Sequence, residues 1–174
     1  MAASKPSSVS PNKKIEHITR IQAPIETIWS ALIDVHDWSW NKWTKLEIEA
    51  SQQPKEEMQG KLRASYEGND EWETFDFTFG EIVSGPKEYV LTWRGSVGPS
   101  GCLFRGNHSI RLVEENANHT NGMKWTKLVH LEHFGGILPA LGLGLPYETL
   151  DRNYLLMNEA LKEFVEGKNK EEGP

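Results

Sequence analysis

A histidine on an apolar strand face is the first residue of this sequence that could take part in proton transfer. His108 lies in a predicted strand over 103–114, and its neighbours on the same face of that strand are apolar or small. These neighbours are Phe104, Gly106, Ile110 and Leu112. An imidazole in such a place can act as a general base or orient a ligand. The other interpretation is a core histidine with a satisfied hydrogen bond, and the sequence leaves both open.

A glutamate on the next predicted strand, over 123–134, is a candidate partner for this histidine. Glu132 shares its face with Leu128, His130 and Phe134, and the opposite face carries Trp125, Val129, Leu131 and His133. By the number of apolar side chains the opposite face is the better core, which would leave Glu132 in solvent. The other orientation would bury Glu132 near His108, where the two could perform acid–base catalysis or form a charge-assisted hydrogen bond.

The potential metal ligands on these two strands do not form a convincing metal site. They are His108, His130, Glu132 and His133. Zinc needs three or four convergent ligands, and adjacent strand residues point to opposite faces, so Glu132 and His133 cannot easily serve together. The sequence also lacks a phosphate loop, a dinucleotide-binding glycine motif and a serine-hydrolase elbow. We therefore expect no metal and no cofactor.

Large side chains on the predicted strands and the last helix are candidate walls of a binding pocket. They are Phe75, Phe77, Phe79, Trp93, Phe104, Phe134, Tyr154 and Met157. For each of them an ordinary place in the core is the alternative. Arg94 and Arg105 could meet a ligand carboxylate or phenolate at the mouth of the pocket, because a guanidinium binds planar anions well, or they could simply be solvated.

The longest element that must position these residues is an amphipathic helix predicted over 147–166. Its apolar residues recur at steps of three and four, and they are Tyr147, Leu150, Tyr154, Met157, Leu161 and Phe164. Pro146 precedes the first turn, where proline is tolerated, and Gly167 stands where a left-handed residue would end the helix. The apolar side of this helix needs a sheet to cover.

The preceding segments supply that sheet. A strand over 15–22 leads into a helix that begins after Pro24, and a second short helix is predicted through 36–40. Six further strands are predicted over 45–51, 61–67, 73–84, 89–95, 103–114 and 123–134. The clearest alternation lies in 73–84, where Phe75, Phe77, Phe79 and Val83 share one face. The order predicts an α+β fold in which a curved antiparallel sheet of about seven strands wraps round the long C-terminal helix.

Length and composition are typical of one intracellular domain. The 174 residues are 37% hydrophobic, enough for a single core, which we place at 15–166 between disordered tails over 1–14 and 167–174. The net charge of −6 argues against nucleic acid as a partner. The single cysteine, with no signal peptide and no membrane-spanning segment in the sequence, favours a cytoplasmic protein without membrane insertion. Nothing in the composition indicates the oligomeric state.

Three stretches of the sequence resemble the START-like, or SRPBCC, superfamily. They are "IQAPIETIWSALIDVHDWSWNKW", "LTWRGSVGPSGCLFRGNHSIRL" and "TKLVHLEHFGGIL", and the resemblance extends over about 15–165. The sequence is most similar to an uncharacterised, polyketide cyclase/dehydrase-like branch. The resemblance implies the helix-grip fold of the birch-pollen allergen, with a deep apolar cavity between sheet and helix. The loops that match its entrance are 95–101 and the apolar, glycine-rich segment 135–144, which could form a gate or a buried connector.

These observations favour the binding or transport of a hydrophobic or aromatic small molecule, such as a lipid, sterol or polyketide, in the cavity. The alternative is a polyketide cyclase or dehydratase-type enzyme that uses His108, together with Glu132 or an arginine, as acid and base. The two hypotheses differ in whether His108 and Glu132 converge inside the pocket. A third possibility, a co-chaperone-like interaction module, is weaker because the sequence alone indicates no exposed apolar patch.

Overall fold

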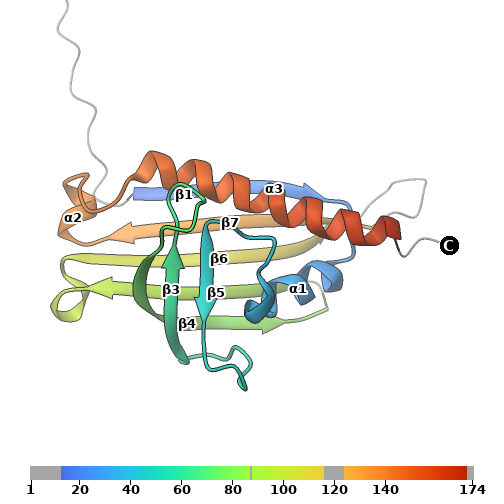
Figure 1. The fold of residues 1–174 in the computed structure, drawn as a ribbon, viewed down its shortest axis with the longest axis horizontal. Helices are drawn as coiled ribbons and strands as arrows, with labels where there is room; N and C mark the ends of the chain where they lie inside the picture. Colours follow the sequence, from blue (N-terminus) through green and yellow to red (C-terminus); the bar gives the residue numbers. More distant parts are fainter. Residues whose placement is uncertain (1–12, 87, 116–123, 172–174) are drawn as a thin grey trace, which may run out of the picture.

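Seven strands and one long helix make up most of the chain (Figure 1). The computed structural model describes residues 13–86, 88–115 and 124–171. The strands are β1 (Lys13–Ile21), β2 (Thr44–Glu47), β3 (Gln59–Ala64), β4 (Glu73–Ser84), β5 (Glu88–Val97), β6 (Phe104–Glu115) and β7 (Trp125–Gly135). The helices are α1 (Ile25–Ile33), η1 (Val35–Asp37), η2 (Pro99–Gly101), α2 (Ile137–Ala140) and α3 (Tyr147–Glu171).

The strands form one antiparallel sheet in the order β1-β7-β6-β5-β4-β3-β2. The sheet curves strongly, so that β2 and β3 cross the direction of the other strands, while α3 lies along the concave side and packs on β1, β7 and α1 (Figure 1). This α+β arrangement confirms the predicted fold. It also brings β6, β7 and the first half of α3 together, which are the elements that carry the candidate acid–base residues.

The predicted elements are found with shifted ends. The strand expected at 15–22 begins at Lys13, and the rest of the expected N-terminal tail, residues 1–12, lies outside the described residues. The helix after Pro24 is confirmed, but the second helix expected through 36–40 is one 3-10 turn, η1. After this turn, Trp38 and Trp40 are buried in the core. The chain therefore leaves the helical conformation where these two indoles enter the core, which the helical pattern did not reveal.

The alternation predicted for β4 holds only for its first half. Phe77 and Phe79 are buried, but the pairing with β5 shifts between Phe79 and Ile82, where β4 has one residue more than its partner. Such a bulge exchanges the two faces beyond it. Ile82 therefore packs against the main core, and Val83, predicted on the phenylalanine face, is not part of that cluster.

The long helix does not stop at Gly167. α3 continues to Glu171 with helical backbone, so the segment expected as a tail from 167 is helical up to that residue, and residues 172–174 lie outside the described part. A glycine marks a helix end when it adopts a left-handed conformation, but Gly167 is not among the glycines with positive φ. The sequence signal at this position was therefore misleading.

The buried side chains form two clusters. The larger joins α1, the tryptophans after it, the middle of the sheet and the C-terminal part of α3. The smaller contains Ile15, Phe134, Leu150 and Tyr154, near the start of α3. No helix in the described part of the chain is long and apolar enough to cross a membrane.

Candidate active site

A cavity of about 510 Å³ lies between the sheet and the first half of α3. Strands β2 to β7 contribute to its wall, as do α2, α3 and the loops that follow β3 and α2. Most of the lining is apolar, and side chains of both core clusters take part, such as Phe77 from the larger and Phe134 from the smaller. This size and lining are typical of pockets that bind small organic molecules.

Eight of the predicted site residues line this cavity: Phe75, Phe77, Trp93, Phe104, His108, Glu132, Phe134 and Tyr154. Phe79 and Met157, predicted as walls, belong to the core instead, with 0% and 1% of their surface exposed. The expected gate segments contribute through Gly95 to Val97 and through Leu138 and Gly144.

The two arginines are not at the cavity. Strand alternation turns Trp93 and Gly106 inward, so Arg94 and Arg105 point to the other side of the sheet. Arg94 pairs with Glu57 at 2.6 Å, and both arginines border a second, more polar hollow of about 460 Å³. The structure therefore places neither arginine in the wall of the main cavity, at whose mouth they were predicted to meet a ligand anion.

The inward face of β7 is the one that carries Glu132. Leu128, His130, Glu132 and Phe134 are buried, whereas His133 is exposed and Trp125, Val129 and Leu131 are half-buried. The expectation from the apolar count is wrong. On β7, Glu132 pairs directly with His108 and His130 with Ile110 of β6, so the inward face of β6 fixes that of β7. Polar side chains occupy this face because they satisfy one another.

Glu132 has two hydrogen-bond partners in the cavity wall. His108 Nδ1 lies 3.2 Å from Glu132 Oε2, and the hydroxyl of Tyr154 donates to the same oxygen. These contacts matter because a buried carboxyl group without partners would destabilise the fold. Gly106 leaves the necessary room, since a Cβ at that position would lie 2.8 Å from Glu132 Oε1. The ring of His108 stacks on Trp93, with centroids 3.9 Å apart and planes 15° from parallel.

The hydrogen bonds continue from His108 away from the cavity. His108 Nε2 lies 2.6 Å from His130 Nε2, and His130 Nδ1 lies 2.7 Å from Asn158 Oδ1. Asn158 Nδ2 lies 3.3 Å from Thr19 Oγ1 on β1. All of these side chains are buried. Glu132, His108, His130, Asn158 and Thr19 thus form one chain of contacts, called here the polar chain.

Burial fixes the protonation of two residues at this site. It lowers the pKa of His130 well below 6.5, and the neighbouring His108 acts in the same direction, so His130 is neutral. Burial also raises the pKa of Tyr154 well above 10, with a further contribution from the charge of Glu132. Tyr154 therefore keeps its proton and donates it in the hydrogen bond to Glu132. At the cavity wall, burial and the nearby Glu73 raise the pKa of Tyr66 to about 12.

Solved structures with this arrangement of elements are numerous and distant in sequence. A hypothetical protein from Helicobacter pylori is 11% identical with a TM-score of 0.67, and the match covers 95% of this chain and 96% of that one. Norcoclaurine synthase from Thalictrum flavum is 12% identical with a TM-score of 0.60, and the match covers 91% of this chain and 96% of that one. The aromatase/cyclase ZhuI from Streptomyces sp. R1128 is 18% identical with a TM-score of 0.53, and the match covers 89% of this chain and 94% of that one. No protein-family model matches, and no curated protein matches by sequence.

The fold is the helix-grip fold that the resemblance implies. The resemblance read from the sequence is confirmed at this level. The element order, the curved seven-stranded sheet and the long C-terminal helix are those of a helix-grip protein.

Three members of the polar chain were not predicted as site residues of the helix-grip domain. His130 was considered only as a metal ligand, and Asn158 and Thr19 were not considered. Alternation places His130 on the face of Glu132, and Asn158 follows Tyr154 by four residues, which puts both on one side of the helix. These signals become useful only once one residue of each element is known to face inward. In the described part of the chain, no group of three or more His, Cys, Asp or Glu side chains could hold a metal.

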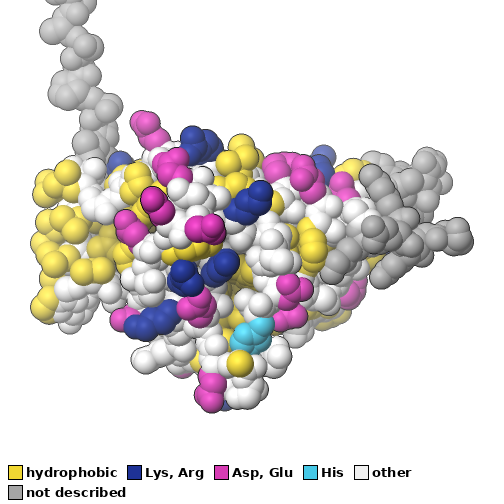
Figure 2. All heavy atoms as spheres, viewed as in Figure 1, with side chains coloured by type: hydrophobic (Ala, Val, Ile, Leu, Met, Phe, Trp, Pro, Cys, Tyr) yellow, Lys and Arg dark blue, Asp and Glu magenta, His cyan; other side chains and the backbone are white. Residues whose placement is uncertain are grey.

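Beside the cavity, the segment that follows β7 exposes large apolar side chains. Ile137, Leu141 and Leu143 are 55%, 67% and 55% exposed, and apolar atoms gather at the end of the molecule where α2 lies (Figure 2). The sequence alone did not indicate this patch. The same segment contributes Leu138 and Gly144 to the cavity wall.

Proposed function

We propose that the protein binds a predominantly hydrophobic, ring-containing small molecule in its cavity and transfers protons on it, as an enzyme of the polyketide cyclase or dehydratase type. The observation that carries this proposal is the convergence of Glu132 and His108, 3.2 Å apart, in the wall of an otherwise mostly apolar cavity. A carrier of apolar ligands needs no such pair, and burying it costs stability. The solved structures with this fold include two enzymes, an aromatase/cyclase and a norcoclaurine synthase, which supports an enzymatic role for the cavity.

The pair can supply both a base and an acid. In its carboxylate form, Glu132 removes a proton from a carbon next to a ligand carbonyl group, and the electron pair of the C–H bond moves into the new double bond. The proton then held by Glu132 and His108 passes to a hydroxyl group on the neighbouring carbon, which leaves as water when its C–O bond breaks. Tyr154 stabilises the carboxylate form by donating to Oε2.

The cavity wall determines what kind of molecule can reach the pair. Phe75, Phe77, Phe104 and Phe134 present aromatic surface, and Trp93 backs the ring of His108. Flat side chains of this kind pack well against planar rings. A folded chain of fused or incipient rings with carbonyl and hydroxyl groups is therefore the substrate class that the wall and the acid–base pair favour together.

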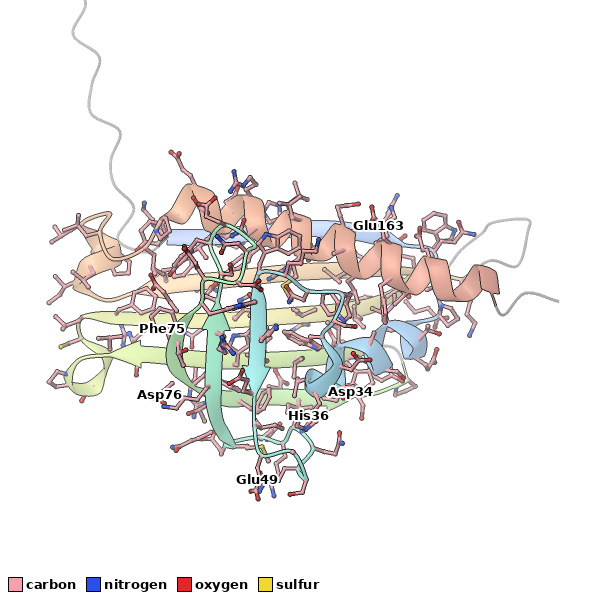
Figure 3. All side chains as sticks on the ribbon, viewed as in Figure 1. Asp34, His36, Glu49, Phe75, Asp76 and Glu163 are labelled. Carbon is pink, nitrogen blue, oxygen red and sulfur yellow. The ribbon has the colours of Figure 1, made fainter. Side chains whose placement is uncertain are left out.

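The test begins with the ligand that the protein carries from its own host. The protein is purified from that source, examined by native mass spectrometry, and extracted to identify the bound compound. The wild type, Glu132→Gln and His108→Ala are then incubated with this compound. Glu163→Gln, on the outward side of α3 (Figure 3), is the matched control because it removes an exposed carboxylate instead.

We expect the wild type and Glu163→Gln to convert the compound. Glu132→Gln and His108→Ala should bind it but convert it about 10²- to 10⁴-fold more slowly, which is the usual contribution of a general acid or base. Recovery of an unchanged compound from the wild type, bound equally well by His108→Ala, would instead identify a carrier and contradict the proposed reaction.

A further inference from the structure

The polar chain behind the cavity wall can be assigned hydrogens in a limited number of ways. Three contacts follow one another: Glu132 with His108, His108 with His130, and His130 with Asn158. Each contact needs one hydrogen between its two atoms. His130 is neutral, so it has a single N–H group, which it can offer either to Asn158 or to His108.

In the first assignment, His130 carries its hydrogen on Nδ1 and donates to Asn158 Oδ1. Asn158 Nδ2 then donates to Thr19 Oγ1, which lies 3.3 Å away. His130 Nε2 must accept, so the hydrogen between the two imidazoles belongs to His108 Nε2. The contact between His108 Nδ1 and Glu132 then needs one additional proton, held either by the carboxyl group or by a cationic His108.

In the second assignment, the amide of Asn158 is turned over. Its nitrogen donates to His130 Nδ1, His130 donates from Nε2 to His108, and His108 donates from Nδ1 to a carboxylate at Glu132. Thr19 then donates its hydroxyl hydrogen to the amide oxygen. The two ends of an amide are nearly equal in shape, and a hydroxyl group can donate or accept, so the exchange needs no repacking.

The two assignments differ by one proton, and both give every contact of the polar chain its hydrogen. We propose that His130, Asn158 and Thr19 are positioning residues that let the Glu132–His108 pair release and recover one proton with all buried hydrogen bonds of the chain intact. The inference rests on the proposed acid–base function and explains how a buried site can act as acid and base in turn. If one protonation state of the pair left a buried hydrogen bond unmade, the other protonation state would be favoured and the pair would not exchange its proton readily.

Three other ionisable groups face the chain from the elements packed against it. On α3, Tyr154 donates to Glu132 in both assignments. On the loop after β3, Tyr66 keeps its own proton because its pKa is raised to about 12. On β1, His17 is engaged with Asp151 at 3.1 Å.

Nitrogen-15 NMR of the histidine side chains in the intact protein tests the inference without a ligand, because it distinguishes the two neutral tautomers and the cation. Spectra are recorded from mildly acidic to mildly alkaline solution. We expect His130 to stay neutral and to change from the Nδ1–H to the Nε2–H tautomer as the Glu132–His108 pair loses its proton. If the pair loses its proton while His130 keeps one tautomer, the inference is overturned. If the pair exchanges no proton at all, the proposed acid–base function fails with it.

Two matched variants separate the amide from a general effect of charge. In Asn158→Asp, an ionised carboxylate can accept but not donate, so His130 Nδ1 should stay protonated throughout the titration. Asn153→Asp is the control, since Asn153 is an equally buried amide of α3 that bonds the Tyr66 carbonyl and contacts neither imidazole. It should retain the tautomer change. Persistence of the change in Asn158→Asp, or its loss in both variants, would overturn the role given to Asn158.

Discussion

At the scale of single residues, the cavity wall shows how a buried carboxyl group is stabilised. Glu132 meets His108 on one side and the hydroxyl of Tyr154 on the other, and Gly106 leaves space for its second oxygen. His108 and Gly106 belong to β6, Glu132 to β7 and Tyr154 to α3, so the site forms only when the sheet and α3 are in contact. Stability and chemistry at this position therefore depend on the same hydrogen bonds.

The hydroxyl of Tyr154 should make a measurable contribution to stability. Tyr154→Phe removes a buried donor to Glu132 and should lower the free energy of unfolding by about 1.5–3 kcal/mol, the range for hydrogen bonds to charged groups. Tyr147→Phe is the control, because its hydroxyl donates to the Leu143 carbonyl at a more exposed place. It should cost about 0.5 kcal/mol. Urea denaturation measures both, and equal losses would argue against a special role for Tyr154.

His130 should make the protein less stable in acid. Its pKa in the folded state lies well below the ordinary 6.5 because the ring is buried. Below about pH 6.5 the unfolded chain therefore binds a proton that the folded protein does not. As the pH decreases, this group lowers the free energy of unfolding by up to about 1.4 kcal/mol per pH unit. Urea denaturation at about pH 7 and about pH 5 should show a smaller loss for His130→Gln than for the wild type. An equal loss of stability between the two pH values in wild type and His130→Gln would contradict a lowered pKa for His130.

The residues of the site were predictable to different degrees. His108 was found because alternation places it among apolar neighbours on β6. Glu132 could not be placed, because counting apolar residues on β7 gives the wrong face when polar side chains satisfy one another in the interior. That information lies in the register between β6 and β7, and periodicity within one strand does not contain it.

At the scale of elements, local pattern predicted the type of each segment better than its ends. The strands and α3 were found, but the bulge in β4 and the continuation of α3 were missed. The bulge accommodates the register of β5, which the pattern within β4 does not contain, and α3 continues past a glycine because Gly167 keeps a helical backbone.

Gly167 offers a direct check of the helix end. Alanine is about 0.5–1 kcal/mol more favourable than glycine inside a helix, and a Cβ at Gly167 would meet nothing within 4 Å. Gly167→Ala should therefore stabilise the protein by that amount in urea denaturation. Gly106→Ala, which would push against Glu132, should destabilise it. An unchanged or lower stability for Gly167→Ala would indicate that the helix ends earlier.

At the scale of the whole molecule, the curved sheet and α3 close round a cavity instead of a continuous core. Side chains of both buried clusters line the cavity, so part of the surface that a solid core would pack is available to a ligand. A ligand that fills this space should bind the folded protein and not the unfolded chain, which links occupancy to stability.

A large side chain that fills the cavity should prevent a ligand from stabilising the protein. With 2-naphthol as a probe at about a hundredfold excess over its dissociation constant, the wild type should gain about 2.7 kcal/mol of stability. Ala64→Phe places a ring in the cavity from β3 and should abolish this gain while the protein stays folded. Ile18→Phe is the control, because Ile18 is 57% exposed on β1, outside the cavity lining, and its substitution should leave the gain intact. Thermal unfolding with and without the probe measures the difference. Equal stabilisation of all three proteins would place the probe elsewhere and would mean that the cavity is not the binding site.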